Sequence, residues 1–135
     1  MGLALRDWIE HHEGLRQDLY QDTEGKYTIG IGRNLSDNGI SIEEAHFLLE
    51  NDIASCQRDL EKFSWYTSAP RGVQDALTNM CFNLGLTRLL GFKRMIAALK
   101  IGDYRKAACE ALDSKWARQV GLRAYDVADV IRAGQ

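Results

Sequence analysis

The sequence predicts an α+β fold, in which a small β-hairpin lobe is joined by one long helix to a helical C-terminal lobe. Strand-like alternation is confined to about residues 15–32, whereas apolar residues recur at helical spacing before this segment and throughout the rest of the chain. The chain has 135 residues, of which 45% are hydrophobic and only one is proline, enough for one domain with its own core. We therefore expect a single domain over residues 1–135, with a binding cleft between the two lobes.

A first helix is expected over about residues 3–13, because apolar residues recur there at helical spacing and Gly14 is a suitable C-cap. This helix should pack with the helical lobe. The hairpin lobe follows over about residues 14–40, where the turn residues Asp22–Gly25 separate two strand-like runs.

The second strand-like run has one nearly bare face, because side chains alternate along a strand. A face made of two glycines and a hydroxyl leaves room for a ligand, although a flexible edge or a bulge would give the same pattern. The two expected faces are Tyr27, Ile29 and Ile31 on one side and Thr28, Gly30 and Gly32 on the other.

A long helix is expected over about residues 42–63. The dipeptide Asn38–Gly39 is a turn signal, and Ser41 followed by Glu44 fits a capping box at the start of the helix. A helix of about 20 residues is roughly 30 Å long, which is enough to bridge two lobes.

The helical lobe is expected over about residues 64–135, since every segment there has helical spacing or a helix boundary signal. The expected helices run from Ser68 and Pro70 to Gly85, around Leu89, from Phe92 to Ile101, from Asp103 to about Ala117, and from Leu122 to Arg132.

The net charge of −2 is divided unevenly between the halves of the chain. Residues 1–63 hold 6 basic and 13 acidic residues, a net charge of −7, whereas residues 64–135 hold 11 and 6, a net charge of +5. A basic half is consistent with attraction to a polyanion, and equally with a solvated helical surface.

The sequence predicts no cofactor and no metal site. Phosphate-loop, dinucleotide and EF-hand patterns are missing from it. The three cysteines, Cys56, Cys81 and Cys109, are odd in number and match no zinc spacing, so we expect reduced, buried thiols rather than disulfides. No signal-peptide or transmembrane stretch stands out, so we expect the chain to begin in the cytoplasm, without stable membrane insertion.

Carboxylates are the strongest candidates for chemistry. Glycosidic cleavage needs one protonated acid at the leaving oxygen and one ionised carboxylate that activates water or attacks directly. Glu13 fits the acid, because the C-terminal end of a helix favours its uncharged form. Asp22 lies in a polar turn and fits the carboxylate, while Thr28, across the hairpin, could hold the water. Each of the three residues taken alone is more commonly an ordinary surface residue.

The segment that contains Glu13, Asp22 and Thr28 resembles the catalytic segment of the phage-type lysozymes, glycoside hydrolase family 24. The resemblance covers essentially the whole chain. The chain departs from the best-known family member at Arg33, Asn83 and Glu110, and its segment from Asn34 to Ser41 is much shorter. The matching segments are Glu13–Arg16, Tyr20, Asp22–Gly25, Tyr27–Gly32, Asn79–Gly85, Gly91–Phe92, Ser114–Trp116, Arg123–Ala124 and Arg132–Gly134.

The resemblance implies a lysozyme-like fold and hydrolysis of the β-1,4 bond between N-acetylmuramic acid and N-acetylglucosamine in peptidoglycan. The family's catalytic Glu, Asp and Thr fall on Glu13, Asp22 and Thr28. Its cleft-lining phenylalanine falls on Phe82, and the arginine that pairs with the catalytic glutamate falls on Arg123. Further substrate contacts are expected at Gly30, Gly32 and Asn83.

The resemblance also implies an endolysin that acts in phage-mediated host lysis. Such an enzyme would stay in the host cytoplasm before lysis and would need a separate holin-type pore to reach the periplasmic cell wall. We expect a monomer that does not bind nucleic acid. Two alternatives are a lytic transglycosylase, which uses one glutamate, and a non-catalytic wall-binding or phage structural module. The presence of both Asp22 and Thr28 argues against each alternative.

Overall fold

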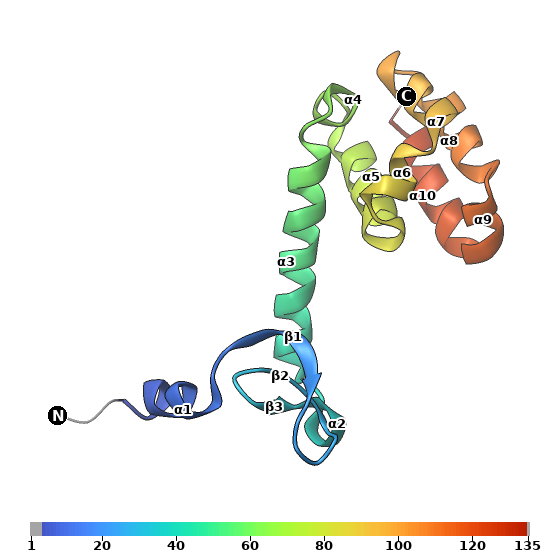
Figure 1. Ribbon diagram of the computed structural model, residues 1–135. Helices are drawn as coiled ribbons and strands as arrows, with labels where there is room; N and C mark the ends of the chain where they lie inside the picture. The colour runs from blue at the N-terminus through green and yellow to red at the C-terminus, as the bar shows by residue number, and fades with distance from the viewer. Residues whose placement is uncertain (1–3, 135) are drawn as a thin grey trace. The chain divides into compact units, whose positions relative to one another are not determined.

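The computed structural model describes residues 4–134 and confirms the α+β class (Figure 1). Its helices and strands fall into two compact units that divide between Phe47 and Leu48, within a long helix. The first expected helix is α1 (Leu5–Glu13), and the expected start at residue 3 lies outside the described residues.

The first unit contains a three-stranded antiparallel sheet rather than a simple hairpin. The third strand was not predicted, and Ile31 and Gly32 form a turn instead of continuing the second strand. The reason is local, since Gly30, the last residue of β2, and Gly32 have φ angles of 73° and 79°, which turn the chain out of the extended conformation. The elements after α1 are β1 (Arg16–Gln21), β2 (Tyr27–Gly30), β3 (Arg33–Asn34) and the short helix α2 (Leu35–Asn38).

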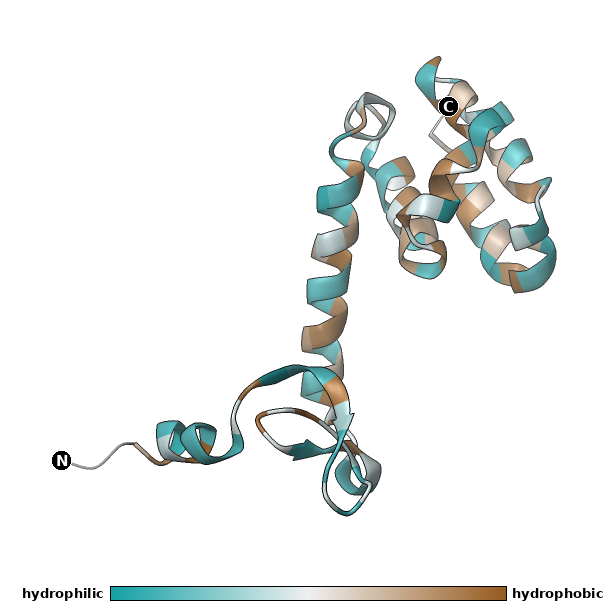
Figure 2. Cartoon of the chain, in the orientation of Figure 1, coloured by the Kyte–Doolittle hydropathy of each residue, from teal (hydrophilic) through white to brown (hydrophobic). Residues whose placement is uncertain are grey.

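The long helix α3 (Ile42–Leu60) begins with the predicted capping box. The Ser41 hydroxyl oxygen accepts a hydrogen bond from the Glu44 N–H at 3.1 Å, and Glu44 Oε1 accepts one from the Ser41 N–H at 2.8 Å. The helix ends at Leu60 rather than at residue 63, because Phe63 is the N-cap of a separate helix, α4 (Ser64–Thr67). Apolar residues continue along α3 (Figure 2), although Leu60 is its only buried residue.

The second unit is helical, as predicted, but the helix expected from Asp103 to about Ala117 is two helices. The break lies at Asp113 and Ser114, where the Ser114 hydroxyl oxygen accepts a hydrogen bond from the Ala117 N–H at 3.1 Å and caps the second helix. The helices after α4 are α5 (Arg71–Leu84), α6 (Leu86–Leu90), α7 (Lys93–Lys100), α8 (Tyr104–Leu112), α9 (Lys115–Val120) and α10 (Leu122–Arg132).

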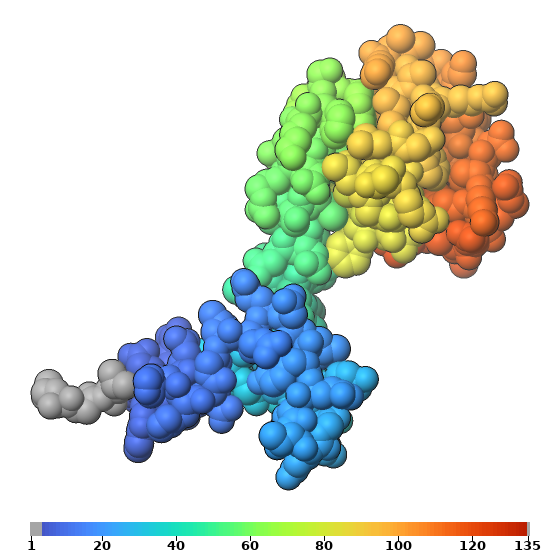
Figure 3. Space-filling model, viewed as in Figure 1, coloured from blue at the N-terminus to red at the C-terminus, as the bar shows by residue number. Residues whose placement is uncertain are grey.

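The core of the second unit lies where α10 packs on α5 and α8, and where α7 packs on α8. Its helices form one continuous body in the space-filling view (Figure 3). Cys81 is buried in this core and Cys56 is half-buried, whereas Cys109 is exposed, so the expectation of buried thiols is wrong for Cys109. None of the described helices combines the length and the apolar character needed to cross a membrane.

Candidate active site

Glu13 is the last residue of α1, and Gly14 ends the helix in the expected manner. The Gly14 N–H donates to the Glu10 carbonyl oxygen at 2.7 Å, and the positive φ of Gly14, 76°, turns the chain away from the helix. The Glu13 side chain is exposed and has no hydrogen bond or ion pair with any described residue. Its carboxyl group is therefore available to an incoming ligand.

Asp22 lies in the turn between β1 and β2, and one of its oxygens organises that turn. Asp22 Oδ1 accepts hydrogen bonds from the N–H groups of Glu24 at 2.8 Å and Lys26 at 2.9 Å. The main chain closes the same turn, because the Asp22 N–H donates to the Lys26 carbonyl oxygen at 2.9 Å. Oδ2 has no hydrogen-bond partner among residues 4–134, so one oxygen fixes the carboxylate and the other can act.

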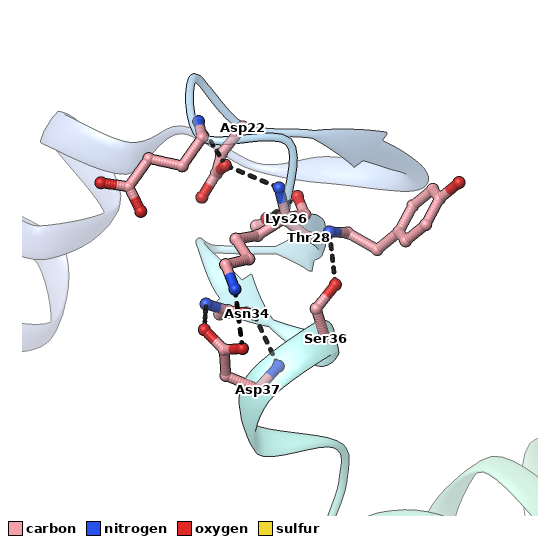
Figure 4. Close-up of polar contacts among 8 residues, drawn as sticks. Asp22, Lys26, Thr28, Asn34, Ser36 and Asp37 are labelled. Carbon is pink, nitrogen blue, oxygen red and sulfur yellow. Dashed lines mark hydrogen bonds and ion pairs between the residues drawn. The ribbon is translucent and has the colours of Figure 1, made fainter.

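Thr28 lies on β2, the central strand, opposite Tyr20 of β1 and Asn34 of β3. Its side chain is buried, with 4% of its surface exposed. The Thr28 hydroxyl donates to the Lys26 carbonyl oxygen at 3.0 Å, the same oxygen that accepts the Asp22 N–H. The main chain of Lys26 therefore links the two candidates directly (Figure 4).

A second polar cluster supports this turn from α2. Lys26 Nζ lies 3.1 Å from Asp37 Oδ1, and Asn34 Nδ2 donates to Asp37 Oδ2 at 2.9 Å. These hydrogen bonds from Lys26 and Asn34 lower the pKa of Asp37. In addition, the Tyr27 N–H donates to the Ser36 hydroxyl oxygen at 2.8 Å, which ties β2 to α2 (Figure 4).

Gly32 meets Glu13, whereas Gly30 has open space beside it. A Cβ atom added to Gly32 would lie 2.9 Å from Glu13 Oε2, closer than real Cβ contacts come. A Cβ atom at Gly30 would meet no atom within 4 Å. Of the two expected glycine contacts, only Gly32 therefore adjoins a candidate catalytic side chain.

Phe82 and Arg123 line one cavity of about 350 Å³ within the second unit. Phe82 on α5 is 43% exposed, although aromatic residues are usually buried. Arg123 donates from Nε to Asn79 Oδ1 at 2.9 Å and from Nη2 to the Asn79 carbonyl oxygen at 3.4 Å. Asn79 thereby orients the guanidinium group. Glu13 belongs to the other unit, so the pairing of Arg123 with Glu13 stays a prediction.

Asn83 lies outside this cavity and holds a tryptophan instead. Asn83 Oδ1 accepts a hydrogen bond at 2.7 Å from Nε1 of Trp116, whose ring is 3% exposed and meets Phe92 edge-on. The substrate contact expected at Asn83 therefore also has a structural role, because its amide satisfies a buried indole N–H.

The ion pair between Arg33 and Glu44 is a feature of the first unit that the sequence did not predict. Arg33 Nη1 lies 2.7 Å from Glu44 Oε1, and Nη2 lies 2.7 Å from Oε2, which makes a bidentate pair. The capping box pointed to Glu44 alone, and no local pattern pointed to its partner on β3. Among residues 4–134, no three metal-ligating side chains gather in one place.

The family model for phage lysozyme matches residues 10–128 of the chain. The chain belongs to the phage lysozyme family. This confirms the family that the segment around the candidate catalytic residues resembles, and the match spans the end of α1, the sheet and nearly all of the helical unit.

Individual proteins also match most of the chain. The pre-baseplate central spike protein of Enterobacteria phage T4 is 32% identical over 98% of the chain, but the chain spans only 28% of that protein's length. The probable T4-type lysozyme 2 of Dictyostelium discoideum is 27% identical, over 97% of the chain and 95% of that protein. An endolysin of Acyrthosiphon pisum secondary endosymbiont phage 1 is 31% identical, over 87% of the chain and 77% of that protein.

Proposed function

We propose that this phage lysozyme is a glycoside hydrolase that cleaves the β-1,4 bond between N-acetylmuramic acid and N-acetylglucosamine in bacterial peptidoglycan. The observation that carries the proposal is the arrangement around Lys26, where Asp22 and Thr28 are bound to one residue and both retain unused acceptor lone pairs. Membership of the phage lysozyme family supports the same class of reaction.

The proposed mechanism uses the oxygen lone pairs of Asp22 and Thr28 that accept no hydrogen bond within the turn. The Thr28 proton is committed to the Lys26 carbonyl oxygen, so its hydroxyl oxygen can accept a hydrogen bond from water. Asp22 Oδ2 can accept the water's other hydrogen. A water that donates both hydrogens directs an oxygen lone pair at the anomeric carbon. As the water attacks, Asp22 takes one proton, and Glu13 gives its own proton to the leaving glycosidic oxygen.

Five further residues are proposed to bind the glycan: Gly30, Gly32, Phe82, Asn83 and Arg123. Open space at Gly30 supports a close approach of a sugar to the main chain, and the exposed ring of Phe82 supports stacking on a sugar face. We further propose that Arg123, oriented by Asn79, pairs with Glu13 in the active enzyme.

We propose that the protein is a monomeric endolysin that acts in phage-mediated host lysis. It would remain in the host cytoplasm until a holin-type pore lets it reach the cell wall. Its similarity to an endolysin supports this role. Its similarity to a phage central spike protein favours a second candidate, a wall-binding structural module.

Mass spectrometry of muropeptides after digestion of purified walls tests the proposal. A hydrolase leaves reducing N-acetylmuramic acid ends, a lytic transglycosylase leaves anhydro ends, and a structural module leaves the glycan intact. We expect reducing ends only. Asp22→Asn is the matched control, because its amide oxygen can still accept both turn hydrogen bonds while the acceptor for the water proton is lost. Anhydro ends, or intact strands, would overturn the proposed function.

A further inference from the structure

We propose that Arg33 and Glu44 are positioning residues that hold the turn at Gly32 against the Glu13 carboxyl group. This inference rests on the proposed function, in which Glu13 is the acid. Neither residue touches the expected reacting atoms, so each would act through the main chain of the turn.

Arg33 and Glu44 form a bidentate ion pair. Both guanidinium nitrogens of Arg33 lie 2.7 Å from a Glu44 oxygen, and Nη1 also donates to the Gly39 carbonyl oxygen at 3.2 Å. A bidentate pair fixes both distance and orientation, which a single contact does not. Arg33 is therefore anchored at two points beyond its own strand.

Glu44 is the fixed end of the pair. Glu44 Oε1 also accepts the Ser41 N–H, and the Glu44 N–H donates to the Ser41 hydroxyl oxygen. The carboxylate thus belongs to the first turn of α3 and is held by that helix. Hydrogen bonds from Arg33 and from the Ser41 main chain lower the pKa of Glu44 to about 2, so it remains ionised over the working range of pH.

The position of Arg33 affects Glu13 through the turn at Gly32. Arg33 directly follows Gly32 and pairs with Ile29 in the sheet, so any shift of its main chain moves the turn. Gly32 in turn has no room for a Cβ atom beside the Glu13 carboxyl group. A displacement of the turn would therefore change the surface on which Glu13 rests.

The pair differs from the three helical ion pairs of the described chain, and it has two contacts where the Lys26–Asp37 pair has one. The pairs Lys62–Asp59, Arg71–Asp75 and Arg132–Asp129 each lie three or four residues apart on one helix or at its end, and each rests on a single contact. Arg33 and Glu44 join a strand to a helix. Both are about two-fifths exposed, and exposed pairs contribute little to stability, so positioning is the stronger role.

Two conservative variants test the inference. Arg33→Lys keeps the charge but not the bidentate contact, and Glu44→Gln keeps an acceptor for the Ser41 N–H but not the charge. Asp129→Asn, which breaks an exposed ion pair on α10, is the control. On soluble, uncrosslinked glycan we expect kcat to fall about 10-fold in each variant, with KM nearly unchanged, because misplacing the acid affects the transition state.

The double variant Arg33→Lys/Glu44→Gln should lose little more than either single variant, because the two residues act as one unit. A readout independent of activity is the NMR signals of the Gly32 amide and the Glu13 carboxyl carbon, which should move in both variants and not in the control. If these signals move but wild-type protein releases no reducing ends, the proposed function fails and the positioning role stands. Unmoved signals, additive losses, or an unchanged kcat in an active enzyme would overturn the inference.

Discussion

At the residue scale, the two candidate carboxyl groups are held in opposite ways. Asp22 is fixed through Oδ1 by two main-chain N–H groups, whereas the Glu13 carboxyl group lies beside Gly32 and has no hydrogen bond to any of residues 4–134. A carboxylate that must aim a water benefits from a fixed position. A general acid must instead exchange its proton with solvent between turnovers, and the exposed Glu13 side chain permits this.

Glu13→Gln should abolish wall lysis and leave thermal unfolding nearly unchanged. The amide keeps the size of the side chain, and no hydrogen bond or ion pair to a described residue is lost. A general acid typically contributes about 10² to 10⁴ in rate, so turbidity assays on purified walls should show a loss of that order. Glu10→Gln on the same helix is the control. Retention of more than about a tenth of the activity would exclude Glu13 as the acid.

Gly32→Ala should reduce activity much more than its effect on stability explains. Gly32 and Gly102 have similar φ angles, 79° and 74°, so alanine at either position should destabilise the fold by about 1 kcal/mol. Only at Gly32 does the new methyl group meet Glu13. We expect equal changes in melting temperature for Gly32→Ala and Gly102→Ala, and a large loss of lysis for Gly32→Ala alone. Equal losses of lysis would show that the contact with Glu13 has no catalytic consequence.

At the element scale, the helices that carry their own boundary signals were predicted well. The capping box at Ser41, Gly14 after α1 and Gly85 after α5 all end or begin helices as expected. The strand β3 has only two residues and exists because it pairs with β2, so no local pattern could reveal it. The cap at Ser114 was missed because helical spacing continues on both sides of it.

In the candidate site too, local sequence patterns pointed to some residues, whereas contacts made only in the folded chain could not be predicted. Glu13, Asp22 and Thr28 lie within 16 residues of one another. A helix end, a polar turn and strand alternation made them candidates, and the family resemblance assigned their roles. The partnership of Arg33 with Glu44 links a strand to a helix that begins eight residues later, and depends on how the intervening segment folds back. Sequence patterns do not encode such a contact.

Glu44→Gln should destabilise the first unit slightly near neutral pH but not in acid, because the ion pair that it breaks is exposed. The pKa of Glu44 is lowered to about 2 in the folded protein, mainly by the hydrogen bond from Arg33, and is about 4.3 when unfolded. Its ionised form therefore stabilises the fold above pH 4.3, and this contribution is lost as the pH falls toward 2. Urea unfolding of the wild-type protein and of the Glu44→Gln variant should give a difference in unfolding free energy that is constant from pH 7 to 5 and vanishes near pH 2. A difference that grows in acid would contradict the pairing.

At the scale of the whole chain, the positive charge of the second half is localised. Residues 86–120, which include α6 to α9, hold eight basic and three acidic residues, and this segment accounts for the entire net charge of +5. Four of these cations line one cavity of about 570 Å³, and none of the four has a hydrogen bond or ion pair with a described residue: Arg88, Lys93, Arg94 and Lys115. Unpaired cations around a cavity favour contact with an anionic surface.

Lysis of whole walls should therefore weaken as salt rises, because the Debye length falls from about 10 Å at 0.1 M to about 3 Å at 1 M. The double variant Lys93→Gln/Arg94→Gln should weaken binding to sedimented walls and leave cleavage of a soluble, neutral oligosaccharide unchanged. The matched control Arg71→Gln/Arg132→Gln makes the same change in net charge, but removes cations that already pair with Asp75 and Asp129. We expect the control to bind walls nearly as wild-type protein does. Equal losses in both double variants would assign the effect to total charge rather than to α6 to α9, and lysis that stays constant up to 1 M salt would exclude an electrostatic contribution.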